Sequence, residues 1–352
     1  MNRNIESWIQ SVCPADEAIM NNVRMIWDHK CMPLGSLGEF QEMIVRIAGA
    51  QKTVKPHIDR KLTFVMAADN GVVSEGVSQS DHHVTTQVVE NMTKDQATIA
   101  IMSKFQGSDF RIIDMGMKEH VPGTLERSLM PGTWNMTKGP AMTYETAAEA
   151  IRIGAEEAAK AAAKGYDLFA TGEMGIGNTT TSTAVLAAFT GCDVKSITGR
   201  GAGLSSEGLE RKVEAIRQAL QVNRPDKNDP VDVLAKVGGL DIAGLTGVLI
   251  GAASVGVPVV IDGFIASVAA LAAKRLCPAA AGYMLPSHCS MEPGALKVFD
   301  ELQLKPVIYG DLHLGEGSGA VLLFAMLDHI MNIYRKLPNF DEAHVETYIP
   351  LK

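Results

Sequence analysis

One carboxylate lies inside a turn of glycine, threonine and asparagine, in the stretch FATGEMGIGNTTTSTAVLAAFTG from Phe169 to Gly191. The apolar residues before Gly172 predict a buried strand, and Asn178, Thr179 and Thr180 open an alanine-rich helix. Free backbone N–H groups at such a turn bind phosphate well. A carboxylate beside a phosphate has a separate use, because it can contact a sugar hydroxyl or a developing cation. The alternative is an ordinary glycine-rich turn with a threonine cap.

The glycines of this turn, Gly172, Gly175 and Gly177, follow neither the GxGxxG nor the GxxxxGK[ST] spacing. Dinucleotide-binding and P-loop interpretations are therefore weak, and a dehydrogenase is disfavoured.

A second glycine-rich loop leads into a predicted amphipathic helix, in TGRGAGLSSEGLERKVEAIRQAL from Thr198 to Leu220. Its early turns carry Arg211 and Lys212. If this helix end faces the first loop, Lys212 can bind the same phosphate as a point charge. The alternative is a solvated helix face with ordinary caps.

A third segment, HLGEGSGAVLLFAMLDHIM from His313 to Met331, places Glu316 between Gly315 and Gly317 before an apolar helix. The glycines would let a planar ligand approach, and partial burial would raise the pKa of Glu316 toward the range of a general base. The alternative is an acid stabilised by the helix dipole.

The remaining candidate residues favour structural roles. Asp69 and Asp262 follow predicted strands, and we expect each to fix a loop by accepting backbone N–H bonds. His82 and His83 are adjacent, and no HxxxH or HxH pattern occurs, so we predict no metal site. Five scattered cysteines without CxxC spacing predict neither a disulfide framework nor a zinc site.

Short β-rich runs alternate with alanine-rich helical stretches, which predicts an α/β fold with a doubly wound parallel sheet. Ligands are expected at the carboxyl ends of its strands. We predict a large α/β domain at 61–320 and a small helical domain built from both termini, 1–60 and 321–352. The expected strand regions are Leu62 to Val72, Phe110 to Met117, Tyr166 to Gly175, Val257 to Phe264, Tyr283 to His288 and Pro306 to Gly319.

The composition narrows the class of protein. The chain has 352 residues, 46% of them hydrophobic, and a formal net charge of −8. This charge argues against generic binding of nucleic acid or anionic membranes. The first residues lack the apolar core of a signal peptide, and glycine, proline and aspartate interrupt the apolar runs. We therefore expect a cytoplasmic protein.

Several long motifs resemble the nicotinate-nucleotide–dimethylbenzimidazole phosphoribosyltransferase family of cobamide (vitamin B12) assembly. They are LGEGSGA, GEMGIGNTT, GRGAGL, KVGGLDIAGLTG and VIDGFIASVAAL. The similarity extends from Met32 to the C-terminal helix. It implies a Rossmann-like sheet, a small helical domain, and a dimer in which the small domain of the neighbouring subunit partly closes the pocket for the aromatic base. The dimer could be a homodimer or a heterodimer with a paralogous subunit.

In this family the phosphoribosyl group of nicotinate mononucleotide moves to an aromatic base. The resemblance implies that Gly175, Gly177, Asn178, Thr179, Thr180 and Lys212 bind the donor. Glu173 would face the ribose, and Glu316 would act as the general base in one inverting displacement that yields an α-riboside phosphate. Ser80, Gln87, Asn70, Met174 and Leu314 would form the acceptor pocket. Neither a metal nor another cofactor is expected, because the pyridinium is already a good leaving group.

The chain departs from the family pattern at four places. Met32 replaces a lysine, Asn70 stands where histidine is usual, His313 stands where arginine is usual, and KDQATIA (Lys94 to Ala100) replaces a glycine-rich helix start. These changes predict altered acceptor choice, with 5,6-dimethylbenzimidazole or a related acceptor such as phenol or p-cresol as the substrate. The alternative is a catalytically silent subunit that completes the site of a paralogue.

Overall fold

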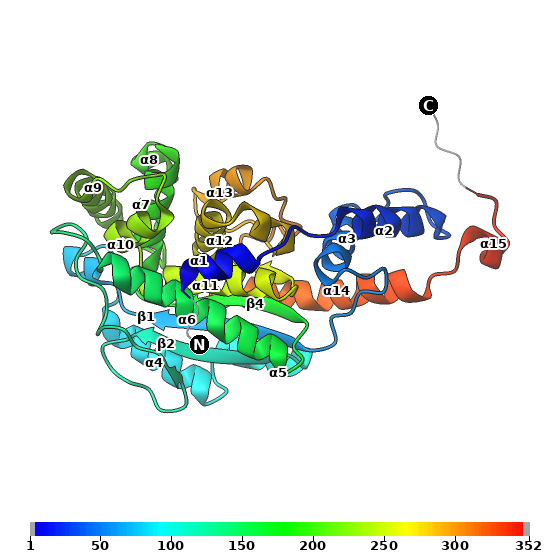
Figure 1. Ribbon diagram of the computed structural model, residues 1–352. Helices are drawn as coiled ribbons and strands as arrows, with labels where there is room; N and C mark the ends of the chain where they lie inside the picture. Colours follow the sequence, from blue (N-terminus) through cyan, green and yellow to red (C-terminus); the bar gives the residue numbers. More distant parts are fainter. Residues whose placement is uncertain (1–3, 348–352) are drawn as a thin grey trace.

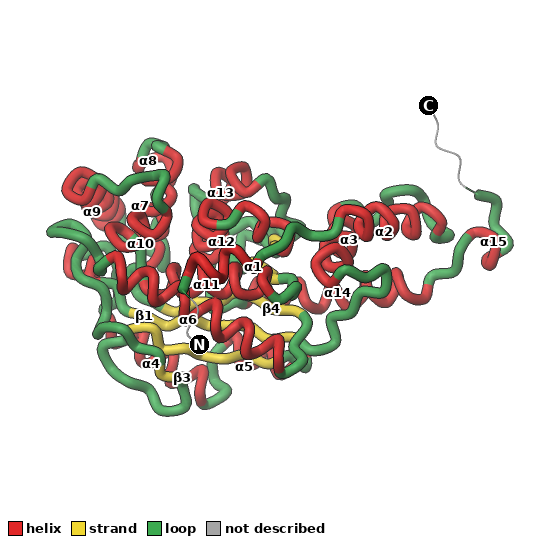
Figure 2. The backbone as a smooth tube through the Cα atoms, in the orientation of Figure 1, coloured by secondary structure: helices red, strands yellow, loops and turns green. Residues whose placement is uncertain are grey.

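A single parallel sheet forms the centre of the computed structural model, which describes residues 4–347 (Figures 1 and 2). Its strand order is β3-β2-β1-β4-β5-β6. The strands are β1 (Lys61–Ala68), β2 (Asp109–Gly116), β3 (Leu125–Glu126), β4 (Leu168–Met174), β5 (Val259–Ile261) and β6 (Met284–Pro286). The order reverses between β1 and β4, and such a switch point leaves a crevice at the carboxyl ends of the strands. The predicted doubly wound fold is confirmed.

Helices cover both faces of the sheet. One face packs against α6 (Tyr144–Ala163), α11 (Leu240–Ser254) and α12 (Phe264–Leu276), and the other packs against α4 (His82–Thr93), α5 (Thr98–Gln106) and α14 (Ser318–Lys336). Residues of β1 alternate between the faces, since Phe64 and Met66 lie in the first apolar cluster and Val65 and Ala67 in the second. This period of two fixes which way each strand side chain points.

The remaining helices surround this framework. They are α1 (Ile5–Ser11), α2 (Glu17–His29), α3 (Glu39–Gln51), α7 (Asn178–Thr190), α8 (Val194–Ile197), α9 (Ser206–Asn223), α10 (Pro230–Val237), α13 (Ala295–Leu302), α15 (Phe340–Ala343), and the 3-10 helices η1 (Gly71–Glu75) and η2 (Pro278–Tyr283). No helix within residues 4–347 is long and apolar enough to cross a membrane.

Segments from both ends of the chain meet beside the sheet, where α2, α3 and α15 lie at the far end of α14 (Figure 1). Lys30 pairs with Asn339, and the rings of Trp27 and Tyr334 are 5.0 Å apart. Helix α1 instead contacts α6 and α11, and α14 continues across the predicted boundary at residue 320. The domain division remains a prediction, and its outermost residues, 1–3 and 348–352, lie outside the described part.

Two details of the sheet differ from expectation. The segment Pro306 to Gly319 forms no strand among the described residues beyond one parallel bridge between His288 and Ile308. Its glycines and aspartate turn the chain toward α14 instead. The two-residue strand β3 was not predicted, because an edge strand this short carries no alternating pattern.

Candidate functional site

A cavity of about 250 Å³ opens at the carboxyl ends of the strands, beside the switch point. Its wall brings together the turn after β4, the loop before α9 and the loop before α14. Three segments that are far apart in sequence, and that were singled out for their chemistry, therefore meet at one place. Of the predicted site residues, Glu173, Met174, Gly175, Gly177, Asn178, Thr179, Leu314 and Glu316 line the cavity.

Glu173 is the last but one residue of β4 and is buried. Its Oε2 accepts a hydrogen bond from Asn178 Nδ2, the side chain that opens α7. Burial and the negative charge of Asp241 raise the pKa of Glu173 to about 8. The carboxyl group is therefore mostly protonated near pH 7, and a cationic ligand would favour its ionised form.

Glu316 lies in a strained loop immediately before α14. It has a φ of 62°, between Gly315 at 87° and Gly317 at 88°, a left-handed conformation that is costly for a residue with a side chain. Asp262 holds this loop, because its two oxygens accept bonds from the N–H groups of Gly317 (3.1 Å) and Ala320 (3.0 Å). The strain is thus balanced by bonds that fix where the Glu316 side chain projects.

The Glu316 carboxylate is nearly buried and faces the start of α5. Its Oε2 accepts a hydrogen bond from the N–H of Ile99 at 3.3 Å. Burial raises its pKa, and the bond from Ile99 lowers it in part. A raised pKa is the property required of a base that works near neutral pH.

Lys212 lies behind the turn that follows β4. Its side chain is 0% exposed, and Nζ donates to Thr179 Oγ1 (2.8 Å) and to the Gly199 carbonyl (3.0 Å). Burial lowers the pKa of Lys212 to about 8, while Glu292 raises it in part. The structure therefore places this cation next to the start of α7, where backbone N–H groups also favour an anion.

The other predicted site residues lie around the cavity rather than on its wall. Thr180 is buried in the first turn of α7. Asn70 is buried and donates to the Ile176 carbonyl at 3.3 Å, behind the turn that follows β4. Ser80 is half-buried and Gln87 is exposed, and the neighbouring Ser78, Gln79 and Val88 form the wall in that region.

The comparison with known proteins agrees with this arrangement. The profile of the family described as "Phosphoribosyltransferase" matches residues 12–345. The nicotinate-nucleotide–dimethylbenzimidazole phosphoribosyltransferase of Acetivibrio thermocellus is 44% identical over 94% of this chain and 95% of its own. The enzyme of that name from Ruminiclostridium cellulolyticum is 42% identical over 99% of both chains. The crystal structure of CobT from Thermus thermophilus superimposes with a TM-score of 0.89 at 37% identity, covering 94% of this chain and 100% of that one.

The chain belongs to the nicotinate-nucleotide–dimethylbenzimidazole phosphoribosyltransferase family. The predicted family and the predicted class of enzyme, a pentosyltransferase, are confirmed.

Two of the places where the chain departs from the family pattern touch the site directly. His313 lines the cavity, with Nδ1 at 2.8 Å from the Asp311 carbonyl. The KDQATIA segment supplies Ile99, whose N–H binds Glu316. Met32 instead packs at the edge of the second apolar cluster.

Sequence reasoning missed several groups of this phosphoribosyltransferase site. Asp241 shares the Asn178 amide with Glu173 at 3.1 Å, and His288 and Glu292 line the cavity. Glu292 Oε1 accepts from the N–H of Gly201, which ties the loop before α9 to the wall. The sequence offered one signal for Asp241, because this acid of the segment DIAG lies in an otherwise apolar helix.

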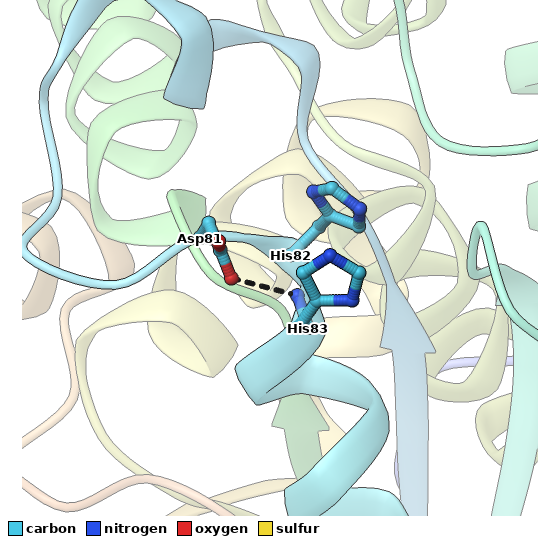
Figure 3. Close-up of side chains that lie close together, drawn as sticks. All are labelled: Asp81, His82 and His83. Carbon is cyan, nitrogen blue, oxygen red and sulfur yellow. Dashed lines mark hydrogen bonds between the residues drawn. The ribbon is translucent and has the colours of Figure 1, made fainter.

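Asp81, His82 and His83 form a small cluster at the start of α4 (Figure 3). Their potential ligand atoms lie within 4.8 Å of one another, which their adjacency in sequence had not suggested. Asp81 Oδ1 accepts from the backbone N–H of His83 at 3.0 Å, and the two imidazoles stack with centroids 4.2 Å apart at 34°. We assign Asp81 to capping of α4, and His83 Nδ1 lies 3.1 Å from Glu119 Oε1.

Proposed function

We propose that this protein transfers the phosphoribosyl group of nicotinate mononucleotide to an aromatic acceptor in cobamide assembly. The acceptor would be 5,6-dimethylbenzimidazole or a related base, or a phenol such as p-cresol. The products would be an α-riboside phosphate and nicotinate. The observation that carries this proposal is that Glu173 and Glu316, from distant segments, line one cavity together with the phosphate-type turn from Gly175 to Thr179.

The donor phosphate would lie at the start of α7. The turn there offers the N-terminal end of α7 and the Thr179 hydroxyl, and Lys212 adds positive charge directly behind that hydroxyl. Phosphate binding would favour the protonated form of Lys212 and offset its burial. Glu173 would then lie beside the ribose, where a carboxylate stabilises the positive charge that develops at the anomeric carbon.

The acceptor would enter on the side of Glu316, Met174 and Leu314. Its nitrogen or oxygen attacks the anomeric carbon as the bond to nicotinate breaks, and the bonding electron pair leaves on the nicotinate nitrogen. The acceptor proton passes to Glu316. Attack opposite the leaving group inverts the configuration, which converts a β-nucleotide into an α-riboside.

The outer surface beside Glu316 supports a dimer that completes this site. Ile101 and Phe105 of α5 are 59% and 94% exposed, and Leu322 and Met326 of α14 are also exposed. The two helices run side by side, because Ile99 bonds Glu316 at one end and Gln106 bonds Asp328 (2.6 Å) near the other. We propose that a second copy of this chain covers these four side chains and closes the acceptor side.

The reaction would take place in the cytoplasm, since five free cysteines are typical of a reducing compartment.

The test is to purify this chain alone and to measure nicotinate release from nicotinate mononucleotide with benzimidazoles and phenols as acceptors. We expect turnover without another protein. No turnover alone, followed by turnover when a paralogue is added, would show a silent partner subunit instead.

A further inference from the structure

Two buried carboxylates share one amide nitrogen at the edge of the site. Asn178 Nδ2 donates to Glu173 Oε2 and to Asp241 Oδ2, the latter at 3.1 Å. Asp241 lies in the first turn of α11, is 0% exposed, and accepts the N–H of Ile242 at 2.9 Å through its other oxygen. Within residues 4–347, neither Glu173 nor Asp241 forms an ion pair with a basic side chain.

The arrangement uses both hydrogens of the Asn178 amide. One hydrogen is directed to each carboxylate, so Asp241 fixes the orientation of the amide and, through it, the position of the Glu173 carboxyl group. Gly175 and Gly239 leave room for this contact because neither carries a side chain. A side-chain carbon at Gly175 would lie 3.1 Å from Asp241 Oδ2, and one at Gly239 would collide with Asp241 Oδ1.

Three carboxylates add negative charge near Glu173, namely Asp241 of α11, Asp262 after β5 and Glu316 before α14. The basic side chains Arg200, His288 and His313 line the same cavity. Lys212 is buried behind the turn and bonds Thr179. Repulsion between neighbouring carboxylates, together with burial, raises the pKa of Glu173 to about 8, and burial raises the pKa of Asp241 to about 6.

We propose that Asp241 is a positioning residue that orients Asn178 toward Glu173 and whose negative charge opposes ionisation of Glu173 until the positive pyridinium nitrogen of the donor lies nearby. This inference rests on the proposed function. When nicotinate mononucleotide binds, its pyridinium offsets the neighbouring negative charge, Glu173 loses its proton to the solvent, and the carboxylate is then ready beside the ribose. Asp241 itself touches no reacting atom in this scheme.

The test is the pH dependence of kcat/KM for nicotinate mononucleotide, whose rising limb reports ionisation of the two required carboxyl groups, Glu173 and Glu316, in the free enzyme. Asp241→Asn removes the opposing charge, so the limb should move to lower pH by about one unit. Asn178→Ala removes the bond that favours the carboxylate, so the limb should move to higher pH. Calorimetry in buffers of different ionisation enthalpy should show proton release when the donor binds to the wild type near pH 7, and less release from Asp241→Asn.

Asp114→Asn is the matched control. Asp114 is also buried at a strand end and accepts two backbone N–H bonds at 2.9 Å, from Gly116 and Met117, but it does not contact Asn178. The Asp114→Asn protein should have a lower melting temperature than the wild type, and the rising limb of its kcat/KM profile should stay at the wild-type pH. If the rising limb of kcat/KM lies at the wild-type pH in both Asp241→Asn and Asn178→Ala, the proposal is wrong. If Asp241→Asn does not fold, an unshifted rising limb in Asn178→Ala is enough to contradict the proposal. A wild type that neither binds nor consumes nicotinate mononucleotide would overturn the proposed function instead.

Discussion

Glu316 combines a strained backbone with a nearly buried carboxylate, and such strain is typical of functional positions. An attacking base or phenol needs a group that takes its proton. Glu316→Gln keeps the shape and an oxygen that can accept from Ile99, but it loses basicity. We expect turnover to fall by about 10² to 10⁴-fold while both ligands still bind, with kcat and calorimetric affinities as the measurements.

The chemical class of the acceptor should change how far Glu316→Gln lowers turnover. A phenol keeps its proton until a pKa near 10, by analogy with tyrosine, whereas an imidazole-type nitrogen attacks with a lone pair that is already free. Turnover with phenols should therefore depend on Glu316 more strongly than turnover with imidazole-type acceptors. Near wild-type turnover of Glu316→Gln on every acceptor would mean that the carboxylate only positions the substrate.

Lys212 is predicted to act on the donor alone. Lys212→Met removes the charge but retains most of the volume of a side chain that is fully buried. Its affinity for nicotinate mononucleotide should fall about tenfold or more, since a charge-assisted bond to an anion is worth roughly 1.5–3 kcal/mol. Acceptor affinity should stay unchanged.

Arg211→Met is the control for Lys212, because Arg211 is adjacent and exposed on the same helix. It should leave both affinities near the wild-type values. A Lys212 variant that loses affinity for the acceptor and keeps it for the donor would contradict the assignment.

The loop before α14 depends on close backbone packing against β4. A side-chain carbon on Gly172 would lie 2.7 Å from the Glu316 carbonyl oxygen, and one on Gly315 would collide with Glu173 Oε1. Gly315→Ala should therefore displace one or both carboxylates. We expect kcat to fall by about 10²-fold, the size typical of displacements near 1 Å.

Gly191→Ala is the control for Gly315→Ala, because it introduces the same kind of backbone strain without displacing a carboxylate. Gly191 ends α7 with a φ of 69°, and a side-chain carbon there meets nothing within 4 Å. Both variants should lose about 1–2 kcal/mol of stability through the left-handed backbone. Only Gly315→Ala should lose activity, and equal activities would show that the contact with Glu173 is unimportant.

Local pattern predicted the elements that carry the site, but not all of its members. The strand, turn and helix from Phe169 to Gly191, the serine-capped helix that bears Lys212 and the helix after Glu316 are all present. The expected loop-fixing roles of Asp69 and Asp262 are confirmed by bonds to Lys118, Gly317 and Ala320. Each of these features has a signal within a few residues of sequence.

Long-range contacts explain what the sequence did not reveal. Asp241 and Asn178 are 63 residues apart in sequence, and no local periodicity indicates that α11 begins beside α7. The contact between Ile99 and Glu316 spans 217 positions. The segment from Pro306 to Gly319 has a strand-like composition, but the sheet ends at β6 and offers it only one bridge.

At the scale of the whole molecule, the exposed apolar side chains of α5 and α14 should control assembly. Phe105→Asp places a charge at the centre of the proposed contact. We expect light scattering to show a monomer and the KM for the acceptor to rise, because the acceptor side stays open. Val222→Asp, at an exposed apolar position on α9, should change neither. A Phe105→Asp protein that stays dimeric would place the interface elsewhere.

The reaction should need no added metal. Nicotinate leaves from a positively charged ring, so its departure requires no Lewis acid, and the positive charge for the phosphate comes from Lys212 and from N–H groups. Turnover should survive EDTA in metal-free buffer. Strict dependence on added magnesium, measured as nicotinate release, would overturn the proposed mechanism.

Helix α14 joins Glu316, the proposed general base, to the periphery of the molecule. It starts two residues after Glu316, and near its other end Tyr334 donates to the Val54 carbonyl (2.8 Å) and Arg335 to the Pro56 carbonyl (2.9 Å). Its 19 residues span about 28 Å. In a helix of that length, a tilt of roughly five degrees moves one end by about 2 Å relative to the other. We therefore expect substitutions in the outer helices to change the proposed proton transfer at a distance, without any contact with the substrates.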